Sequence, residues 1–194
     1  MHIIGLTGGI GSGKSTIART LVRRGYTVYL CDEEAKRIVV EDVVVRAQIE
    51  DLLGAEVFVD NIYQPSVVLR KLANDPSLLE HLNAIIHPTV LEDIRAASKR
   101  GKAEDLLFVE SAILYESGVA QVCEFVAAVV APESVRLARV LKRDPNRNEA
   151  EVRRCINRQM TDEELVRCAD VVLENDGVQS IDLLVDRLLE NIHS

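Results

Sequence analysis

The chain has 194 residues, of which 47% are hydrophobic and 28% are charged, and its formal net charge is −8. This length and composition are typical of one globular domain, with room for a small insertion. The negative charge argues against a nucleic acid or an anionic membrane as the main partner, and it favours a small-molecule substrate.

The four cysteines show neither a C-x-x-C motif nor metal-ligand spacing with the four histidines. We therefore expect reduced thiols rather than a zinc site or a disulfide framework. The N-terminus passes directly into a glycine-rich loop, which does not fit a signal peptide. No apolar run approaches the ~20 residues of a membrane-spanning helix. These features predict a cytoplasmic protein.

The chain is organised around its first sixteen residues. An apolar strand is predicted over residues 1–6, and Gly8 to Ser15 satisfy the pattern G-x-x-x-x-G-K-[ST] before a helix predicted over 15–24. Glycines let backbone N–H groups approach a polyphosphate closely, and the helix N-terminus adds partial positive charge. We expect Lys14 to reach the β and γ oxygens and the Ser15 hydroxyl to ligate Mg²⁺. The alternative is a glycine-rich turn that binds nothing, and the strand-loop-helix context disfavours it.

A second strand is predicted over 27–30, and a helical region follows it. Strand, helix and strand within about thirty residues indicate the start of a parallel sheet. Residues 33–100 contain no convincing strand but show helical periodicity in three stretches, with Pro88 inside the third permitting the helix to restart. The stretches are residues 33–53, 67–73 and 77–99. We interpret this region as a helical insertion, in which a kinase could hold the molecule that accepts the phosphoryl group.

The sheet is predicted to resume in the second half of the chain. Apolar runs indicate strands over 106–109, 125–130 and 170–174, and helical patterns cover 132–143, 150–159 and 181–192. The order of elements predicts an α/β fold of the P-loop kinase type, with three layers and a parallel five-stranded sheet.

Two carboxylates follow predicted strands, at the edge where ligands of parallel sheets gather. Asp32 suits the base that takes a proton from an acceptor hydroxyl, and it suits a helix N-cap equally well. Glu110 suits a residue that supports Mg²⁺ or its water shell, or it is a solvated strand end.

A dense group of arginines lies in and after the helix predicted over 132–143. Arg136, Arg139 and Arg143 are spaced i, i+3 and i+7, so they share one helix face. A solvated face with acidic partners is the simplest interpretation of any one of them. In a chain of net charge −8, however, this density favours at least one or two arginines that act on a transferring phosphoryl group. Arg139, Arg143 and Arg147 are the candidates.

Together these features resemble the dephospho-CoA kinase family, P-loop enzymes that phosphorylate the ribose 3′-hydroxyl of dephospho-CoA in the last step of CoA synthesis. The resemblance runs nearly end to end. It rests on Ile4 to Ser15, Asp32-Glu33-Glu34-Ala35-Lys36, Leu82 to Pro88, Arg139 to Asp144 with Gln159, and Ala169-Asp170 with Asn175-Asp176-Gly177.

The resemblance implies roles for individual residues, with ATP and Mg²⁺ as cofactors. Asp32 would be the catalytic base, while Lys14, Arg139 and Arg143 would carry the developing charge. ATP would be bound by Gly11, Ser12, Gly13, Lys14, Ser15, Thr16, Arg147 and Asn175, with Ser15 on the metal. The acceptor would be held by Asp32, His87 and Glu110. Considered without the resemblance, His87 is interpreted as a histidine whose hydrogen bonds are satisfied within the fold or as one that caps a helix.

The resemblance also divides the chain into parts of a single kinase domain. The core would comprise about 1–32 and 104–194, the acceptor-binding insertion about 33–103, and a lid about 139–160. We expect a monomer or weak homo-oligomer that binds no nucleic acid and no membrane.

Four positions depart from the family pattern. Glu110 stands for an aspartate and Ala112 for a proline, so the carboxylate reaches one methylene further. Lys36 replaces an arginine and cannot make a bidentate phosphate contact. Pro65 stands near a place where the family often has an arginine.

Two other functions stay open at this point. One is a nucleoside or nucleotide kinase with another acceptor. The other is a nucleotide-dependent switch, which would need neither an acceptor base at Asp32 nor an arginine cluster.

Overall fold

The computed structural model describes residues 1–193 and divides into two compact units. One unit comprises Met1–Tyr29 and the chain from Ser98 onward, and the other comprises Leu30–Ala97. The second unit is therefore a continuous middle stretch of the sequence, and the stretches before and after it fold together as the first unit.

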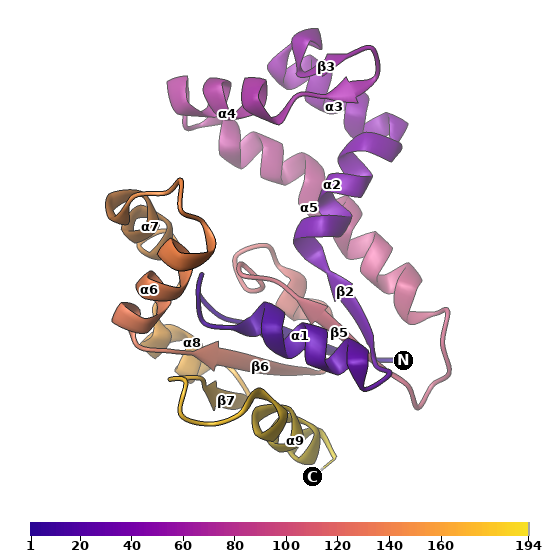
Figure 1. Ribbon diagram of the computed structural model, residues 1–194. Coiled ribbons are helices and arrows are strands. Elements are labelled where there is room, and N and C mark those ends of the chain that lie inside the picture. Colours follow the sequence, from indigo (N-terminus) through magenta and orange to yellow (C-terminus); the bar gives the residue numbers. More distant parts are fainter. Residues whose placement is uncertain (194) are drawn as a thin grey trace. The chain divides into compact units, whose positions relative to one another are not determined.

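The first unit is built on a five-stranded parallel sheet in a three-layer α/β arrangement (Figure 1). The strands are β1 (His2–Thr7), β2 (Thr27–Leu30), β5 (Leu106–Glu110), β6 (Phe125–Val130) and β7 (Val171–Glu174), in the order β2-β5-β1-β6-β7. The central strand β1 pairs in parallel with β5 and β6, so that Ile4 lies opposite both Phe108 and Phe125. Because the strands are parallel, the loops that follow β1 and β5 leave the sheet at the same edge.

Amphipathic helices cover this sheet. They are α1 (Lys14–Arg23), α6 (Glu133–Arg143), α7 (Glu149–Ile156), α8 (Asp162–Cys168) and α9 (Ile181–Ile192), with a short 3₁₀ turn η2 (Val119–Val122). Helices α1 and α9 contact each other, and they also contact β5 and β7 respectively (Figure 1). Their buried faces carry Leu21 in α1 and Leu184 and Leu188 in α9. Burying each leucine contributes roughly 1.5–3 kcal/mol to the free energy of unfolding.

The expected strands at 27–30 and 125–130 and the expected helix at 181–192 are confirmed. Helix α8, in contrast, is absent from the sequence-based prediction. Its seven residues are too few to show a hydrophobic period. The available signal was a capping box, in which the Thr161 hydroxyl accepts from Glu164 N and the Glu164 carboxylate accepts from Thr161 N.

The second unit is mainly helical. Its elements are α2 (Cys31–Glu41), α3 (Val43–Leu53), a 3₁₀ turn η1 (Ala55–Val57), β3 (Phe58–Val59), β4 (Ile62–Tyr63), α4 (Pro65–Asn74) and α5 (Leu78–Ser98). The single helix expected over 33–53 is two helices, because Asp42 adopts an extended backbone and caps α3. Its carboxylate accepts from Val44 N at 2.9 Å and from Val45 N at 3.0 Å.

The prediction of no strand between residues 33 and 100 is wrong. Strands β3 and β4 pair as an antiparallel hairpin, joined by Asp60 and Asn61 at φ values of 51° and 65°. Two-residue hairpin turns require this left-handed conformation, which Asp and Asn tolerate. The Phe58 and Tyr63 rings pack in a tilted arrangement, with centroids 5.3 Å apart and an interplanar angle of 48°. Strands of two residues are too short for an alternating pattern to show.

The helical stretch expected over 77–99 is confirmed as α5, a single helix of 21 residues that runs through Pro88 without the restart that a proline permits. An interior proline removes one helical hydrogen bond. Leu82 before it and Val90 and Ile94 after it are buried, so packing on both sides holds the helix together. Neither α5 nor any other helix within residues 1–193 has the length and apolar character needed to cross a membrane.

Candidate active site

The loop between β1 and α1 ends at a helix start that no side chain caps. Gly13 is the N-cap of α1, in a left-handed conformation with φ 103°, and it makes no side-chain cap hydrogen bond. Within the loop, Ser12 N donates to Gly9 O at 3.1 Å, which closes a tight turn. An uncapped helix start offers N–H groups and partial positive charge to an anion. The loop therefore has the geometry of a phosphate-binding site.

The outer side of the loop is closed by α6 and by Asn175, which follows β7. A Cβ on Gly11 would lie 2.5 Å from Arg136 O, and a Cβ on Gly13 would lie 2.1 Å from Asn175 Nδ2. Real Cβ atoms do not approach other heavy atoms this closely. The glycines are therefore needed for contact on the outside of the loop as well as for backbone conformation.

Substitution of Gly13 by alanine separates these two requirements when it is compared with Gly25→Ala. Gly25 also has a positive φ, 89°, but nothing lies within 4 Å of its ideal Cβ position. Both variants should lose about 1–2 kcal/mol of stability for a left-handed alanine. Gly13→Ala must also displace the buried Asn175, so we expect a larger loss and at least roughly tenfold weaker ADP binding.

Urea unfolding and calorimetric titration with ADP measure both quantities. Gly25→Ala is expected to bind ADP like the parent protein. Equal affinities of the two variants for ADP would show that the contact with Asn175 does not shape the loop.

Lys14, Ser15 and Glu110 converge at the start of α1. Glu110 is the last residue of β5, and the strand register places it opposite Leu6, just before the loop. Its Oε1 lies 3.7 Å from Lys14 Nζ and accepts from Ser15 Oγ at 3.3 Å. Glu110 is only 7% exposed, so the alternative of a solvated strand end is wrong. A hydroxyl and a carboxylate oxygen side by side fit a hard cation such as Mg²⁺.

Arg139 and Asn175 hold the outer carbonyl groups of the loop. Arg139 Nη1 donates to Gly11 O at 3.4 Å, to Ser12 O at 3.3 Å and to Asn175 O at 3.0 Å. The buried Asn175 side chain donates from Nδ2 to Ser12 O at 2.7 Å. Since the carbonyls are held on the outside, the loop conformation is fixed by side chains from two other elements.

The expectation that Arg136, Arg139 and Arg143 share one face is confirmed, because all three lie on the loop side of α6. Arg139 and Arg143 line a pocket of about 380 Å³ together with Lys14, Ser15, Thr16 and Arg19. Arg143 is exposed and pairs with Asp144 at 2.8 Å. Arg147 does not line this pocket; it is exposed, and its guanidinium lies 3.9 Å from Asp144 and from Cys155 Sγ.

Sequence reasoning passed over Arg136, a buried arginine that packs against the loop at Gly9. It is 6% exposed, and a Cβ on Gly9 would lie 2.2 Å from its Nη1. The signal that it shares a face with Arg139 was present in the sequence. Which arginine of that face becomes buried depends on how closely α6 approaches the loop, and spacing alone does not give that distance.

Asp32 and His87 belong to the second unit. Asp32 is the second residue of α2, directly after β2, and its side chain is exposed. The N-cap of α2 is Leu30, so the alternative that Asp32 caps this helix is wrong. His87 is half-buried within α5, which rules out a helix-capping role. Burial lowers the pKa of His87, so its imidazole is neutral at physiological pH and offers hydrogen bonds rather than charge.

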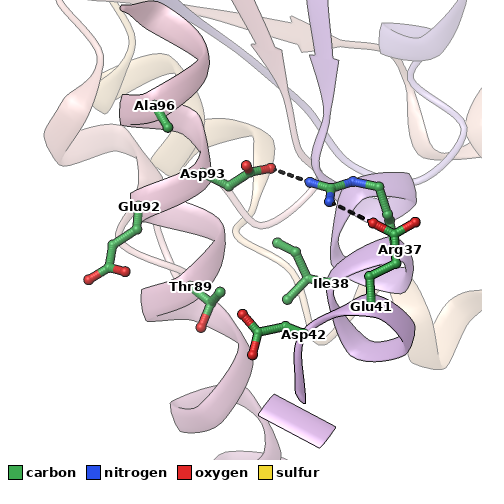
Figure 2. A pocket seen from close by; sticks show the side chains of 8 residues that line it. All are labelled: Arg37, Ile38, Glu41, Asp42, Thr89, Glu92, Asp93 and Ala96. Atoms are coloured by element: carbon green, nitrogen blue, oxygen red, sulfur yellow. Dashed lines mark hydrogen bonds and ion pairs between the residues drawn. The ribbon is translucent and has the colours of Figure 1, made fainter. Parts of the chain in front are cut away.

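A separate pocket of about 460 Å³ lies between α2 and α5 (Figure 2). Arg37 is the positively charged side chain that lines this pocket. Its guanidinium forms ion pairs with Glu34, Glu41 and Asp93 at 2.6, 3.1 and 2.6 Å. These carboxylates raise the pKa of Arg37. Four carboxylates line the pocket, from Glu41, Asp42, Glu92 and Asp93. The excess of negative charge disfavours a ligand that carries phosphate groups.

The parallel sheet, the glycine-rich loop and the contacts of Lys14 and Ser15 with Glu110 define the class of protein, which is that of the P-loop kinases. Within this class, the model of the family described as dephospho-CoA kinase matches residues 2–180. The chain belongs to the dephospho-CoA kinase family.

Individual relatives agree with this assignment. The chain is 38% identical over 189 residues to the dephospho-CoA kinase of Bacteroides fragilis (strain YCH46), which covers 97% of this chain and 90% of that protein. The crystal structure of TT1252 from Thermus thermophilus matches with a TM-score of 0.82 at 32% identity, covering 99% of this chain and 96% of that one. Dephospho-CoA kinase from Campylobacter jejuni matches with a TM-score of 0.69 at 20% identity, covering 98% and 96%, and this likeness concerns the fold.

Proposed function

We propose that this protein transfers the γ-phosphoryl group of ATP to the ribose 3′-hydroxyl of dephospho-CoA, giving CoA and ADP in the last step of CoA synthesis. Membership of the family supports this reaction. The observation that carries it is the convergence of Lys14 and Ser15 on Glu110 beside an uncapped helix start. This arrangement suits a triphosphate with a bound cation.

The residues of the loop bind the donor phosphates in this proposal. Backbone N–H groups from Gly11 to Thr16 surround the phosphates, and Lys14 contacts the β and γ oxygens. Arg143, which is exposed in the same pocket, offers a positive charge to the transferring group. Arg139 contributes its charge from a fixed place beside the loop, and Asn175 supports the loop from outside.

Ser15 and Glu110 would hold Mg²⁺, since their oxygens already lie within 3.3 Å of each other. When bound, this ion neutralises charge on the donor phosphates. The extra methylene of Glu110 relative to the family pattern is compatible with this place, because the carboxylate reaches Ser15 from the end of β5. Lys14, Arg139 and Arg143 supply the remaining positive charge near the loop.

Asp32 is the proposed base. The acceptor O3′ forms a bond to the γ-phosphorus while the bond from that phosphorus to the β–γ bridging oxygen breaks, and the hydroxyl proton passes to the Asp32 carboxylate. An exposed carboxylate in the first turn of a helix, directly after a strand of the sheet, is available for this transfer. His87 is proposed to hold the acceptor as a neutral hydrogen-bonding group, and Arg147 to contact the nucleotide.

We also propose that the protein acts in the cytoplasm as a monomer or weak homo-oligomer without nucleic acid. The net charge of −8 supports the exclusion of nucleic acid. The four cysteines, all within residues 1–193, form no disulfide there, which suits a reducing compartment.

Acceptor-dependent release of ADP tests the function. ADP formation from ATP and Mg²⁺ is measured alone and with dephospho-CoA, adenosine, AMP or shikimate as the acceptor. We expect strong stimulation by dephospho-CoA and little by the others. Stimulation by a different acceptor would replace the proposed substrate. Tight nucleotide binding without stimulation by any acceptor would favour a nucleotide switch.

A further inference from the structure

Two side chains outside the proposed catalytic set converge on the first half of the phosphate loop. Gln159 Oε1 accepts a hydrogen bond from Ile10 N at 2.8 Å. Arg136 Nη1 lies against Gly9, where a Cβ would come within 2.2 Å of it and within 3.6 Å of Gln159 Oε1. The peptide between Gly9 and Ile10 is therefore enclosed by a guanidinium and a carboxamide from two different parts of the chain.

Ile10 is held on its other side as well. Its side chain packs against a buried cluster formed by Val140 of α6 with Val152 and Ile156 of α7. Both its amide and its side chain are thus anchored in the segment around α6 and α7. Ile10 is therefore one of the residues that connect the phosphate loop to this segment.

Gln159 is itself firmly placed. It follows α7, and its backbone N donates to Ile156 O at 3.1 Å. The next residue, Met160, donates from its backbone N to Glu116 Oε1 at 3.3 Å, which ties this turn to the stretch after β5. The carboxamide therefore reaches the loop from a turn that is fixed at both sides.

Arg136 is buried in a way that stability alone does not explain. Its nearest carboxylate atom, Asp162 Oδ1, lies 3.7 Å from Nη2, which is beyond hydrogen-bond distance. Among residues 1–193, neither Arg136 Nε nor Asp162 Oδ1 has a hydrogen-bond partner. The Asp162 side chain is 29% exposed, so the buried member of the pair is Arg136, and a buried guanidinium with incomplete hydrogen bonding is destabilising. Such an arginine is retained more readily where it has another purpose, and here the guanidinium faces the loop at Gly9.

We propose that Arg136 and Gln159 are positioning residues for the phosphate loop. They fix its first half, from Gly9 to Gly11, as Arg139 and Asn175 fix its second half. A glycine-rich loop loses more conformational entropy on ordering than any other backbone, so external contacts that hold it beforehand lower the cost of phosphate binding. Neither residue touches the phosphates, and Gln159 makes the loop geometry depend on the turn between α7 and α8.

The proposal rests on the nucleotide site of the proposed function, and ADP affinity tests it without any acceptor. Gln159→Met keeps the size of the side chain but removes the acceptor for Ile10 N. We expect about tenfold weaker binding of ADP with Mg²⁺ by calorimetric titration, the effect of losing one hydrogen bond. The affinity for dephospho-CoA should stay within about twofold of that of the parent protein. The midpoint of thermal unfolding should stay within about 3 °C of the parent value.

Gln159→Glu is the rescue variant, because it keeps an oxygen acceptor at the same reach and Arg136 lies beside it. We expect its ADP affinity to return to within about threefold of the parent protein. Gln179→Met, on the exposed turn before α9, is the matched control and should bind ADP normally. Should Gln159→Met fail to fold, Gln159→Asn, which retracts the amide by one methylene, replaces it with the same expected loss.

Three outcomes would overturn the proposal: normal ADP affinity in Gln159→Met, no rescue by Gln159→Glu, or a parallel loss of ADP affinity, acceptor affinity and thermal stability. The last result would mean that Gln159 has a general structural role. Failure of the proposed function is distinct from all three, since the parent protein would then bind no ADP or would transfer no phosphoryl group to dephospho-CoA.

Discussion

Replacing Asp32 by asparagine is expected to reduce phosphoryl transfer by about 10²–10⁴-fold, the usual contribution of a general base. The amide has the shape of the carboxylate but cannot accept the hydroxyl proton. Because Asp32 is exposed and does not cap α2, its loss should leave the fold and the affinity for ADP almost unchanged. Turnover at saturating ATP and dephospho-CoA, together with ADP titration, measures both quantities.

Glu33→Gln is the control for this experiment. Glu33 is the next residue in the same helical turn and is also exposed, so the variant removes one charge from the same place in α2. We expect it to keep normal turnover. Near-normal turnover in Asp32→Asn would remove Asp32 from the role of base, and equal losses in the two variants would indicate a general effect of charge at the start of α2.

Lys14→Ala is expected to weaken ATP binding or transfer by at least about tenfold, because it removes the charge that contacts the β and γ oxygens. In the protein, Lys14 Nζ lies 3.7 Å from Glu110 Oε1, and its side chain is 13% exposed. Removing it also takes away the positive charge that offsets the Glu110 carboxylate, so that carboxylate repels the donor phosphates more strongly. The effect should therefore exceed that of losing an ordinary surface lysine.

Lys99→Ala provides the comparison, since Lys99 is an exposed lysine of the same unit that lies outside the loop. Its ATP affinity and turnover should match those of the parent protein. Unchanged kinetics in Lys14→Ala would show that this loop is not the phosphate site, and the assignment of Ser15 and Glu110 to the metal would then lose its basis.

The sheet and the phosphate loop were predictable because their signals are local. Glycine, lysine and serine at fixed spacing define the loop wherever it follows a strand. The strand at 125–130 is an unbroken apolar run, which only a strand covered on both faces tolerates. The closeness of Glu110 to Lys14 followed from the parallel order of strands, since adjacent parallel strands end at the same edge.

Features that depend on short segments or on tertiary packing were not predictable in the same way. The hairpin at Phe58–Tyr63 has two residues per strand, and only its Asp60-Asn61 turn carried a signal. Helix α5 keeps Pro88 because of packing around it, which a sequence does not display. The burial of Arg136 depends on the approach of α6 to Gly9, and nothing in residue spacing measures that distance.

The most direct test of the proposed function is the position of the new phosphate on the product. Dephospho-CoA is incubated with ATP, Mg²⁺ and the protein, and the product is analysed by phosphorus NMR coupled to the ribose protons. We predict one new phosphomonoester, coupled to the proton on the 3′ carbon, in an amount equal to the ADP formed. A phosphate on any other atom, or ADP without a phosphorylated acceptor, would contradict transfer to the 3′-hydroxyl.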